Sequence, residues 1–308
     1  MKLQGQHGPT MTDEQSYGTL YVVATPIGNL EDITVRALKV LGTVDLIASE
    51  DTRHTRKLLS HHYIDGALTS YHEHNEQERT PQLIRKLQDG RSLALVSNAG
   101  TPSVSDPGYR LIEAAVQNGI RVVPIPGAAA AVTALSGSGL PTDTFTFIGF
   151  LPRKKKRRTD QLMTLAGEPR TLIFYESPQR VGALIDDLIE IFGDRRAVLA
   201  REMTKIHEEF LRGNLTELSA NLKQRASVRG ECTLLVTGRQ KDSARITAAV
   251  IEELQEALAT SGKRLSEIVK AIAADTGISR SKLYEEAIKM KKNLQNDKLQ
   301  ASGRQTDG

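Results

Sequence analysis

The chain has 308 residues, 39% of them hydrophobic, and a formal net charge of +4 at pH 7. This length suits two ordinary domains, each with a buried core. The longest apolar stretches, such as residues 128–135, are far too short to cross a bilayer, and no signal segment is evident, so we expect a cytoplasmic protein outside the membrane. The single cysteine, Cys232, excludes an internal disulfide framework and is expected in the core rather than as a nucleophile.

Short apolar runs alternate with helical patterns in the first half of the chain. Strands are predicted at residues 20–25, 46–49, 67–71, 92–97 and 121–124. Helices are predicted at 33–41, around Leu58 and Leu59, at 75–88 and at 109–118. Alternation of this kind favours a mainly parallel sheet that helices cover on both faces.

A second set of elements begins near residue 150. Its predicted strands are 170–175, 197–201 and 231–236, with a helix at 180–192 and a mixed polar and apolar stretch at 208–212. After residue 240 only helical periodicity remains. The sequence therefore predicts an α/β fold, which we divide into a disordered leader at 1–17, α/β domains at 18–149 and 150–240, a helical domain at 241–292 and a disordered tail at 293–308.

Three loops rich in small or turn-forming residues follow predicted strands of the first domain. They are the first loop (residues 24–32), the second loop (97–108) and the third loop (124–129). Ligands of parallel sheets bind at the carboxyl ends of strands, and small side chains let a ligand approach the backbone, so we expect one shared cleft. The chain has neither a GxGxxG nor a GxxxxGK[ST] motif, which disfavours a nicotinamide cofactor and a nucleoside triphosphate.

Two segments are candidates for binding an anionic partner. Six consecutive basic residues follow Pro152, where a connection between domains is expected: Arg153, Lys154, Lys155, Lys156, Arg157 and Arg158. They either neutralise phosphates or form a solvated linker. Residues 265–284 predict two amphipathic helices joined by a turn, similar to a helix-turn-helix, with Arg280, Lys282 and Lys289 on the second helix. The alternative is a helical hairpin that only packs on the body of the protein.

Seven segments form a specific combination. They read VATPIGNLEDIT from Val23, SEDTRHTRKLL from Ser49, SNAGTPSVSDPG from Ser97, VPIPGAAAAVTAL from Val123, GLPTDTFTFIGFLP from Gly139, TLIFYESPQR from Thr171 and LAREMTKIHEEFLRG from Leu199. Together, and in this order, they resemble the ribosomal RNA small subunit methyltransferase I family, which has the tetrapyrrole-methylase fold. None of them alone carries this resemblance.

The resemblance implies that S-adenosylmethionine binds in a cleft between two α/β domains of a homodimer, and that its methyl group passes to the 2′-hydroxyl of a cytidine in 16S rRNA by in-line displacement. RNA would contact the basic run and the helical tail. By position, the resemblance assigns these residues to the cofactor: Pro26, Gly28, Gly100, Thr101, Pro102, Ser103, Val104, Pro126, Gly127, Ala128, Tyr175, Glu176 and Ser177.

A positioned base would help to deprotonate a ribose hydroxyl. The candidate catalytic residues lie in matched segments near strand ends and are Glu50, Asp51, Arg53, Glu202 and Lys205, with His207 as a further possible base. The guanidinium groups of Arg53 and Arg201 suit pairing with phosphate or carboxylate. For Glu50, Asp51 and Arg53 the alternative is a structural role, in which they cap a helix and pair with one another.

The chain departs from the family pattern in two places. Asn98 stands where the family usually has Asp, and Ala128 and Ala129 stand where Pro-Ser is common. Asn keeps the shape and hydrogen bonding of Asp but cannot act as a base, so we assign position 98 a supporting role.

The sequence alone leaves two other functions open. A methyltransferase of the same fold could act on a small tetrapyrrole-like acceptor, although the basic run and helical tail argue against it. A nucleic-acid-binding regulator without enzymatic activity would leave the three loops without a purpose. The segment His72, Glu73, His74 lacks a third ligand at metal spacing, so we expect no metal.

Overall fold

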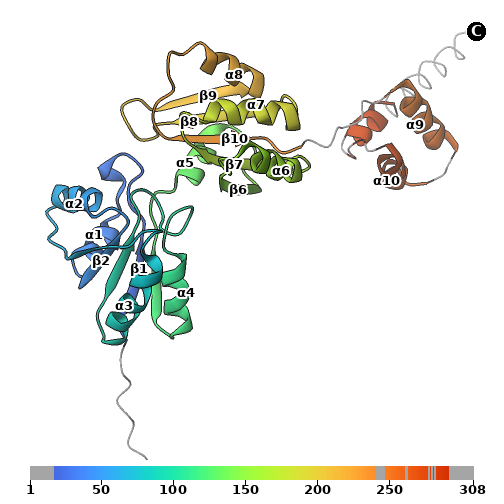
Figure 1. Cartoon of the computed structure of the whole chain (residues 1–308). Coiled ribbons are helices and arrows are strands. Elements are labelled where there is room, and N and C mark those ends of the chain that lie inside the picture. The colour runs from blue at the N-terminus through green and yellow to red at the C-terminus, as the bar shows by residue number, and fades with distance from the viewer. Residues whose placement is uncertain are drawn as a thin grey trace, which may run out of the picture. The chain divides into compact units, whose positions relative to one another are not determined.

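The computed structural model describes residues 17–239, 247–260, 263–276, 278, 280 and 282–290. They form two compact units that divide between Thr237 and Gly238 (Figure 1). The predicted leader, apart from Tyr17, and the predicted tail at 293–308 lie outside the described residues. Within the described ranges, none of the helices is both long and apolar enough to span a membrane.

The first sheet is parallel throughout and has the order β3-β2-β4-β1-β5. Its strands are β1 (Thr19–Val23), β2 (Leu46–Ser49), β3 (Leu68–Ser70), β4 (Leu93–Val96) and β5 (Arg121–Ile125). The connection after β1 leads toward β2, whereas the connection after β4 leads in the opposite direction, toward β5. The loops that follow the neighbouring strands β1 and β4 therefore diverge at the carboxyl edge of the sheet. This is the position where ligands of doubly wound sheets bind.

Helices cover both faces of the first sheet, and successive side chains of β4 pack against the helices of opposite faces. Leu93 and Leu95 pack with residues of α3 (Glu76–Gln88) and α4 (Tyr109–Gln117), whereas Ala94 and Val96 pack with residues of α1 (Val35–Leu41) and α2 (Thr52–His61). Successive side chains of a strand point to opposite faces, so a fully apolar strand requires cover on both. The predicted parallel sheet with helices on both faces is confirmed.

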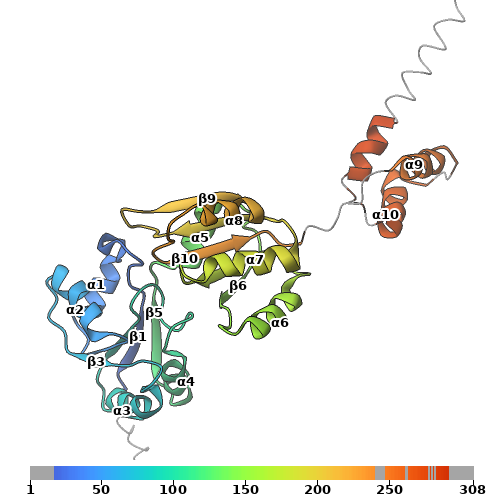
Figure 2. The ribbon, with the colours of Figure 1, turned by 45° about the horizontal axis from the view of Figure 1, so that its top comes forward.

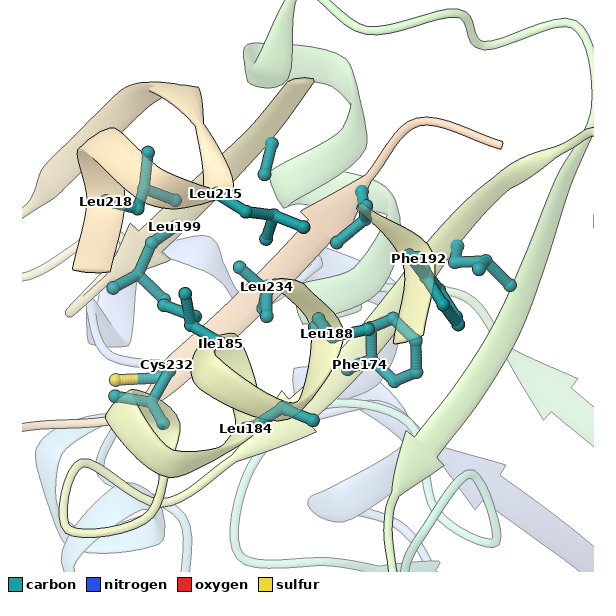
Figure 3. Close-up of a cluster of buried hydrophobic side chains, with 14 of the residues drawn as sticks. Phe174, Leu184, Ile185, Leu188, Phe192, Leu199, Leu215, Leu218, Cys232 and Leu234 are labelled. Atoms are coloured by element: carbon teal, nitrogen blue, oxygen red, sulfur yellow. The ribbon is translucent and has the colours of Figure 1, made fainter. Parts of the chain in front are cut away.

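The second sheet is mixed and has the order β6-β7-β10-β8-β9, with only the β6–β7 pair parallel. Its strands are β6 (Phe145–Phe150), β7 (Thr171–Glu176), β8 (Arg196–Arg201), β9 (Glu209–Asn214) and β10 (Cys232–Val236). Helices α6 (Lys155–Leu165), α7 (Val181–Phe192) and α8 (Leu215–Lys223) contribute to the core on one face. Figure 3 shows α7 side chains such as Ile185 and Leu188 against Phe174, Leu234 and Cys232, which confirms that Cys232 is a core residue.

Helix α5 (Ala130–Ser138) follows the first sheet in the chain but packs on the second sheet (Figures 1 and 2). Ala134 and Leu135 share a cluster there with Ile173, Val198 and Leu235. Because β6 also lies in the second sheet, the two sheets divide between Ile125 and Phe145, earlier than the predicted boundary at 149/150. The sequence missed this since the helix consists mostly of small residues, which show no apolar face.

The basic run leads into α6, which begins at Lys155, and Arg158 differs from its neighbours. Residues 153–157 are exposed, but Arg158 is buried, with its Nε donating to Asp187 Oδ2 of α7 at 2.7 Å. The two side chains are 9% and 8% exposed. The prediction that Arg158 contacts RNA is therefore wrong, because its guanidinium is already engaged in a buried ion pair.

Most of the described residues of the second unit lie in helices. Helix α9 (Ala248–Thr260), α10 (Leu265–Thr276) and the helical residues 282–290 share an apolar cluster. Leu254, Ile268, Ile272 and Leu283 are among its buried members. The predicted amphipathic helices are present, whereas the predicted turn residue Gly277 lies outside the described residues.

We expect Arg158→Ala to destabilise the protein by about 3 to 5 kcal/mol, because it leaves the Asp187 carboxylate buried without its partner. Arg157→Ala is the matched control, since Arg157 is exposed, and should change stability by less than about 0.5 kcal/mol. Urea unfolding of both variants measures the difference. Equal stability of the two variants would contradict the structural role of Arg158.

Candidate active site

The three loops meet at the carboxyl edge of the first sheet. The Thr25 N–H donates to the Gly100 carbonyl at 2.9 Å, and the Gly100 N–H donates to the Thr25 carbonyl at 3.0 Å. The second loop is tied to the third by the Thr101 hydroxyl, which donates to the Ala128 carbonyl at 3.3 Å. The expectation that the loops share one location is confirmed.

The second sheet contributes Tyr175, at the end of β7. Its hydroxyl accepts a hydrogen bond from the Ala131 N–H at 3.0 Å, and thereby satisfies a free backbone donor in the first turn of α5. Phe147 and Phe150 contact the ring edge-on, at centroid distances of 4.9 and 5.6 Å. Burial raises the pKa of Tyr175, so the phenol stays protonated and keeps its place.

A cavity of about 340 Å³ lies where the loops and the second sheet meet. Six predicted cofactor residues line it: Gly100, Thr101, Val104, Tyr175, Glu176 and Ser177. The sequence did not assign the other lining residues, which are Ile27, Ala99, Ser105, Asp106, Ala129, Ala130, Phe150, Pro178, Glu231, Cys232 and Thr233. Most of them flank a predicted residue by one or two positions, so the cavity is lined largely by the segments that the sequence singled out.

The remaining predicted cofactor residues do not line the cavity: Pro26, Gly28, Pro102, Ser103, Pro126, Gly127 and Ala128. The two glycines serve close packing instead. A Cβ on Gly28 would lie 2.6 Å from Lys205 Cγ, and one on Gly127 would lie 2.9 Å from Ala24 Cβ. These positions hold the loops against each other and against the second sheet, so they support the cavity without facing it.

Backbone strain concentrates around the cavity. Of the five described residues other than glycine with positive φ, four lie in the second loop or just after β8: Ser103, Ser105, Glu202 and Thr204, with φ between +50° and +67°. Side chains with a Cβ rarely adopt this region. The Asn29 N–H donates to the Thr204 hydroxyl at 3.0 Å, which joins the first loop to the strained segment. Such residues persist where the surrounding contacts fix them, and they cluster at functional sites.

Asp51 and Arg53 have the structural role that the sequence left open. Asp51 Oδ1 accepts from the Arg53 N–H at 2.9 Å and caps α2, while Arg53 Nη2 lies 3.1 Å from Asp51 Oδ2. The hydrogen bonds from Arg53 hold the pKa of Asp51 at about 2. Neither residue lines the cavity, so neither is placed to accept a proton from a substrate there.

Lys205 joins two carboxylates beside the cavity. Its Nζ lies 2.8 Å from Glu202 Oε1 and 3.1 Å from Glu231 Oε2, and Glu231 lines the cavity. The hydrogen bond from Lys205 lowers the pKa of Glu202. Although burial opposes it, the pKa of Lys205 is raised by its bonds to the two carboxylates. Glu202 and Lys205 therefore stay charged, and Lys205 holds the two carboxylates in place rather than acting as a base.

Two further candidates are not directed to the cavity. Arg201 Nη2 pairs with Glu209 Oε2 at 3.0 Å, between neighbouring strands. His207 is exposed and is not among the cavity-lining residues.

Asp106 is a carboxylate of the cavity that sequence reasoning missed. It lines the cavity, and burial raises its pKa to about 6, with the negative charge of Glu50 adding to the rise. It is the one acidic residue of the second loop, which is the signal that could have identified it. A carboxyl group with this pKa is ionised near neutral pH yet basic enough to accept a proton.

Asn98 has the supporting role that the sequence suggested. Its side-chain Oδ1 accepts from the Asp51 N–H at 3.1 Å, while its backbone N–H donates to Glu50 Oε2 at 3.3 Å. An amide makes the first bond without adding a second negative charge beside Glu50. Asn98 therefore links β2 to the second loop, and Glu50 acts on Asp106 through its charge.

Residues 19–219 match the family model described as Tetrapyrrole (Corrin/Porphyrin) Methylases. Solved structures with this fold include uroporphyrin-III C-methyltransferase from Thermus thermophilus, with a TM-score of 0.51 and 24% identity over 71% of this chain and 94% of that chain. Cobalt-precorrin-4 methyltransferase has a TM-score of 0.55 and 18% identity over 74% of this chain and 98% of its own. At these identities the likeness supports the fold.

Curated relatives are more similar. The ribosomal RNA small subunit methyltransferase I of Micromonospora olivasterospora is 48% identical over 91% of this chain and 89% of its own length. The proteins of the same name from Halalkalibacterium halodurans and Escherichia coli O157:H7 are 47% and 46% identical, over 89% of this chain and 98% and 96% of their own lengths.

The fold and the cavity at its loop edge are those of a methyltransferase. The chain belongs to the tetrapyrrole methylase family and, within it, to the ribosomal RNA small subunit methyltransferase I group. Its methyl donor is S-adenosylmethionine.

The cavity fits this cofactor. Its volume lies within the range of small-molecule sites, about 300 to 1,000 Å³. Gly100 has a φ of +75°, and a Cβ there would meet no atom closer than 3.6 Å, so backbone rather than a side chain faces the space. Ala129 and Ala130 leave room at the start of α5, Phe150 and Tyr175 supply aromatic surface, and hydroxyls such as that of Thr101 supply polar contacts.

We expect Ala130→Leu to weaken S-adenosylmethionine binding at least about tenfold, or about 1.4 kcal/mol, because the added branch occupies the cavity. Val132→Leu is the control, since Val132 lies on the same helix, is 56% exposed and does not line the cavity. Isothermal titration calorimetry measures both. Unchanged affinity in Ala130→Leu would place the cofactor elsewhere.

Proposed function

We propose that this chain methylates the 2′-hydroxyl of a cytidine in 16S rRNA, with S-adenosylmethionine as the donor. The observation that carries the proposal is the 46 to 48% identity, along about nine-tenths of the chain, to proteins named for the methylation of small-subunit ribosomal RNA. The basic side chains of the chain and the carboxylate in its cavity give this chemistry a physical basis. The alternative acceptor, a tetrapyrrole-like small molecule, has only the shared fold in its favour.

The proposed reaction is an in-line displacement at the methyl carbon. The bound cofactor supplies a methyl group that its sulfonium makes electrophilic. The ribose 2′-oxygen gains this methyl group and loses its proton, and Asp106 is the group that we assign to accept the proton. The cavity residues hold the hydroxyl in line, and positioning of this kind can supply about 7 to 11 kcal/mol of the barrier.

RNA binding is assigned to exposed cations of both units. Arg153, Lys154, Lys155, Lys156 and Arg157 are exposed at and before the start of α6. Arg280 and Lys282 lie on the helical residues of the second unit. Such side chains bind phosphates without reading sequence, and so position the RNA. Arg158 is left out of this set because it is buried in its pair with Asp187.

We assign the protein to the cytoplasm, where ribosomal subunits are assembled, and to a homodimer. Val132 and Phe145 are 56% and 41% exposed, and apolar side chains of this size favour burial between copies of a chain. Light scattering that gives the mass of one chain at micromolar concentration would contradict the dimer.

We expect labelled methyl transfer from S-adenosylmethionine to small ribosomal subunits or to 16S rRNA, and none to DNA. Ala130→Leu is the control for transfer that depends on the cavity. Transfer to neither RNA substrate, in a protein that binds the cofactor, would contradict the RNA acceptor and favour a small molecule.

We expect Asp106→Asn to lower kcat by about 10²- to 10⁴-fold, because the amide cannot accept the proton. In the wild type, kcat should rise with pH up to about 6, where Asp106 ionises, and then level off. Glu50→Gln should move this midpoint to lower pH, since it removes the charge that helps to raise the pKa of Asp106. A wild-type profile without this midpoint, or an Asp106→Asn variant with full kcat, would exclude Asp106 as the base.

Stability gives the control for Asp106→Asn. The pKa of Asp106 is higher in the folded protein than its ordinary value of 3.8, so the stabilising contribution of the protonated form is present below pH 4 and is lost as the pH rises through about 6. Asp106→Asn removes this ionisation. Above pH 6 the variant should unfold at a temperature no lower than the wild type, which separates a catalytic loss from unfolding.

A further inference from the structure

Helix α2 carries an exposed basic face to which the proposed function assigns no role. Arg53, Arg56, Lys57, Ser60 and His61 line a wide, open groove together with Leu30 of the first loop. Their spacing places them on one side of the helix. The opposite side, with Thr55, Leu58 and Leu59, is buried against the first sheet.

Both ends of α2 are fastened to the loops that form the cofactor cavity. At its start, Asp51 caps the helix and donates its backbone N–H to Asn98 of the second loop. At its end, His62 Nε2 lies 3.3 Å from the Leu30 carbonyl oxygen of the first loop. The basic face is thus held in a fixed position relative to the carboxyl edge of the first sheet.

The basic side chains on this face differ in whether they pair with an acidic residue. Arg53 is 86% exposed but pairs with Asp51. Arg56 and Lys57 are exposed, and no ion pair or side-chain hydrogen bond is recorded for either of them in the described part of the chain. Two adjacent cations that do not stabilise the fold, on a rigid helix beside the cavity, suit phosphate groups of a polyanion.

Tyr63 follows the helix and has an unusual conformation for its size. Its φ is +56°, and it is 97% exposed, so the fold gains little from the ring. Tyr63 comes two residues after His61, the last residue of the basic face. Exposed aromatic rings together with cations are typical of surfaces that stack unpaired bases while the cations hold the backbone. This combination favours single-stranded RNA over an acidic protein surface.

We propose that the outer face of α2, with Tyr63, binds a single-stranded segment of the substrate RNA next to the nucleotide that enters the cavity. Arg56 and Lys57 contact its phosphates, and the ring of Tyr63 stacks on a base. This inference rests on the proposed function, because it assigns a binding surface for the same RNA substrate.

The test compares two double variants with identical charge changes. Arg56→Gln with Lys57→Gln alters the basic face. Arg85→Gln with Lys86→Gln alters an adjacent Arg-Lys pair on α3, which covers the opposite face of the first sheet. We expect the α2 variant to raise KM for small subunits at least tenfold, and the α3 variant to leave it within twofold. S-adenosylmethionine affinity, measured by calorimetry, should be unchanged in both.

Salt dependence supplies a second readout that misfolding would not imitate. The slope of log Kobs for 16S rRNA against log salt should become shallower by about 1.5 in the α2 variant, since two phosphate contacts are lost. Tyr63→Ala should raise KM at least threefold without changing this slope, because stacking releases no counterions.

The outcomes separate this inference from the proposed function. If the wild type methylates RNA and the two double variants behave alike, the assignment of α2 is overturned while the function stands. If Tyr63→Ala has the KM of the wild type, stacking by Tyr63 is overturned. If the wild type transfers no methyl group to RNA, the proposed function fails, and the assignment of α2 fails with it.

Discussion

The paired backbone hydrogen bonds between Thr25 and Gly100 are the contact on which the site depends. They fasten the loop after β1 to the loop after β4, and the neighbouring bond from Thr101 to Ala128 adds the loop after β5. Gly100 is suited to this position because its φ is +75° and its backbone faces the cavity. A parallel sheet brings the ends of its strands to one edge, but specific hydrogen bonds are needed to hold the three loops together as one side of the cavity.

The second sheet completes the cavity because the chain crosses to it early. Helix α5 starts at the edge of the first sheet and ends on the second, so the alanines at its start belong to both parts of the site. Tyr175 bonds to the first turn of this helix, which fixes the second sheet against the third loop. The side chain of Ala129 cannot cap α5, and the phenol of Tyr175 supplies an acceptor for that turn instead.

The carboxylates in and around the cavity differ in their surroundings and in their roles. Asp51 and Glu202 have basic partners that lower their pKa values, so they stay ionised and hold the structure. Asp106 is buried near Glu50, which shifts its pKa in the opposite direction. Environments that push the pKa values of neighbouring carboxylates apart are how a protein assigns one of them to proton transfer.

The amino-acid sequence predicted most of the strands, the parallel first sheet and the three loops, because the spacing of apolar residues and the positions of Gly and Pro are local signals. It did not predict that α5, most of whose residues are small, packs on the second sheet, or that Arg158 is buried, because its partner Asp187 lies 29 residues away. The role of Asp106 was also beyond local reasoning, since its pKa depends on burial and on the charge of Glu50, which follows β2. Segment positions could be read from the sequence, whereas the orientation of single residues within them depends on tertiary contacts.

The most direct test of the central claim is the chemical position of the new methyl group. Small subunits methylated with isotope-labelled S-adenosylmethionine can be digested to nucleosides, and mass spectrometry then shows whether the label remains with the sugar or with the base. We expect the label on the ribose of a single cytidine. Label on a base, or spread over many nucleotides, would contradict an active site that aligns one ribose hydroxyl with the cofactor and Asp106.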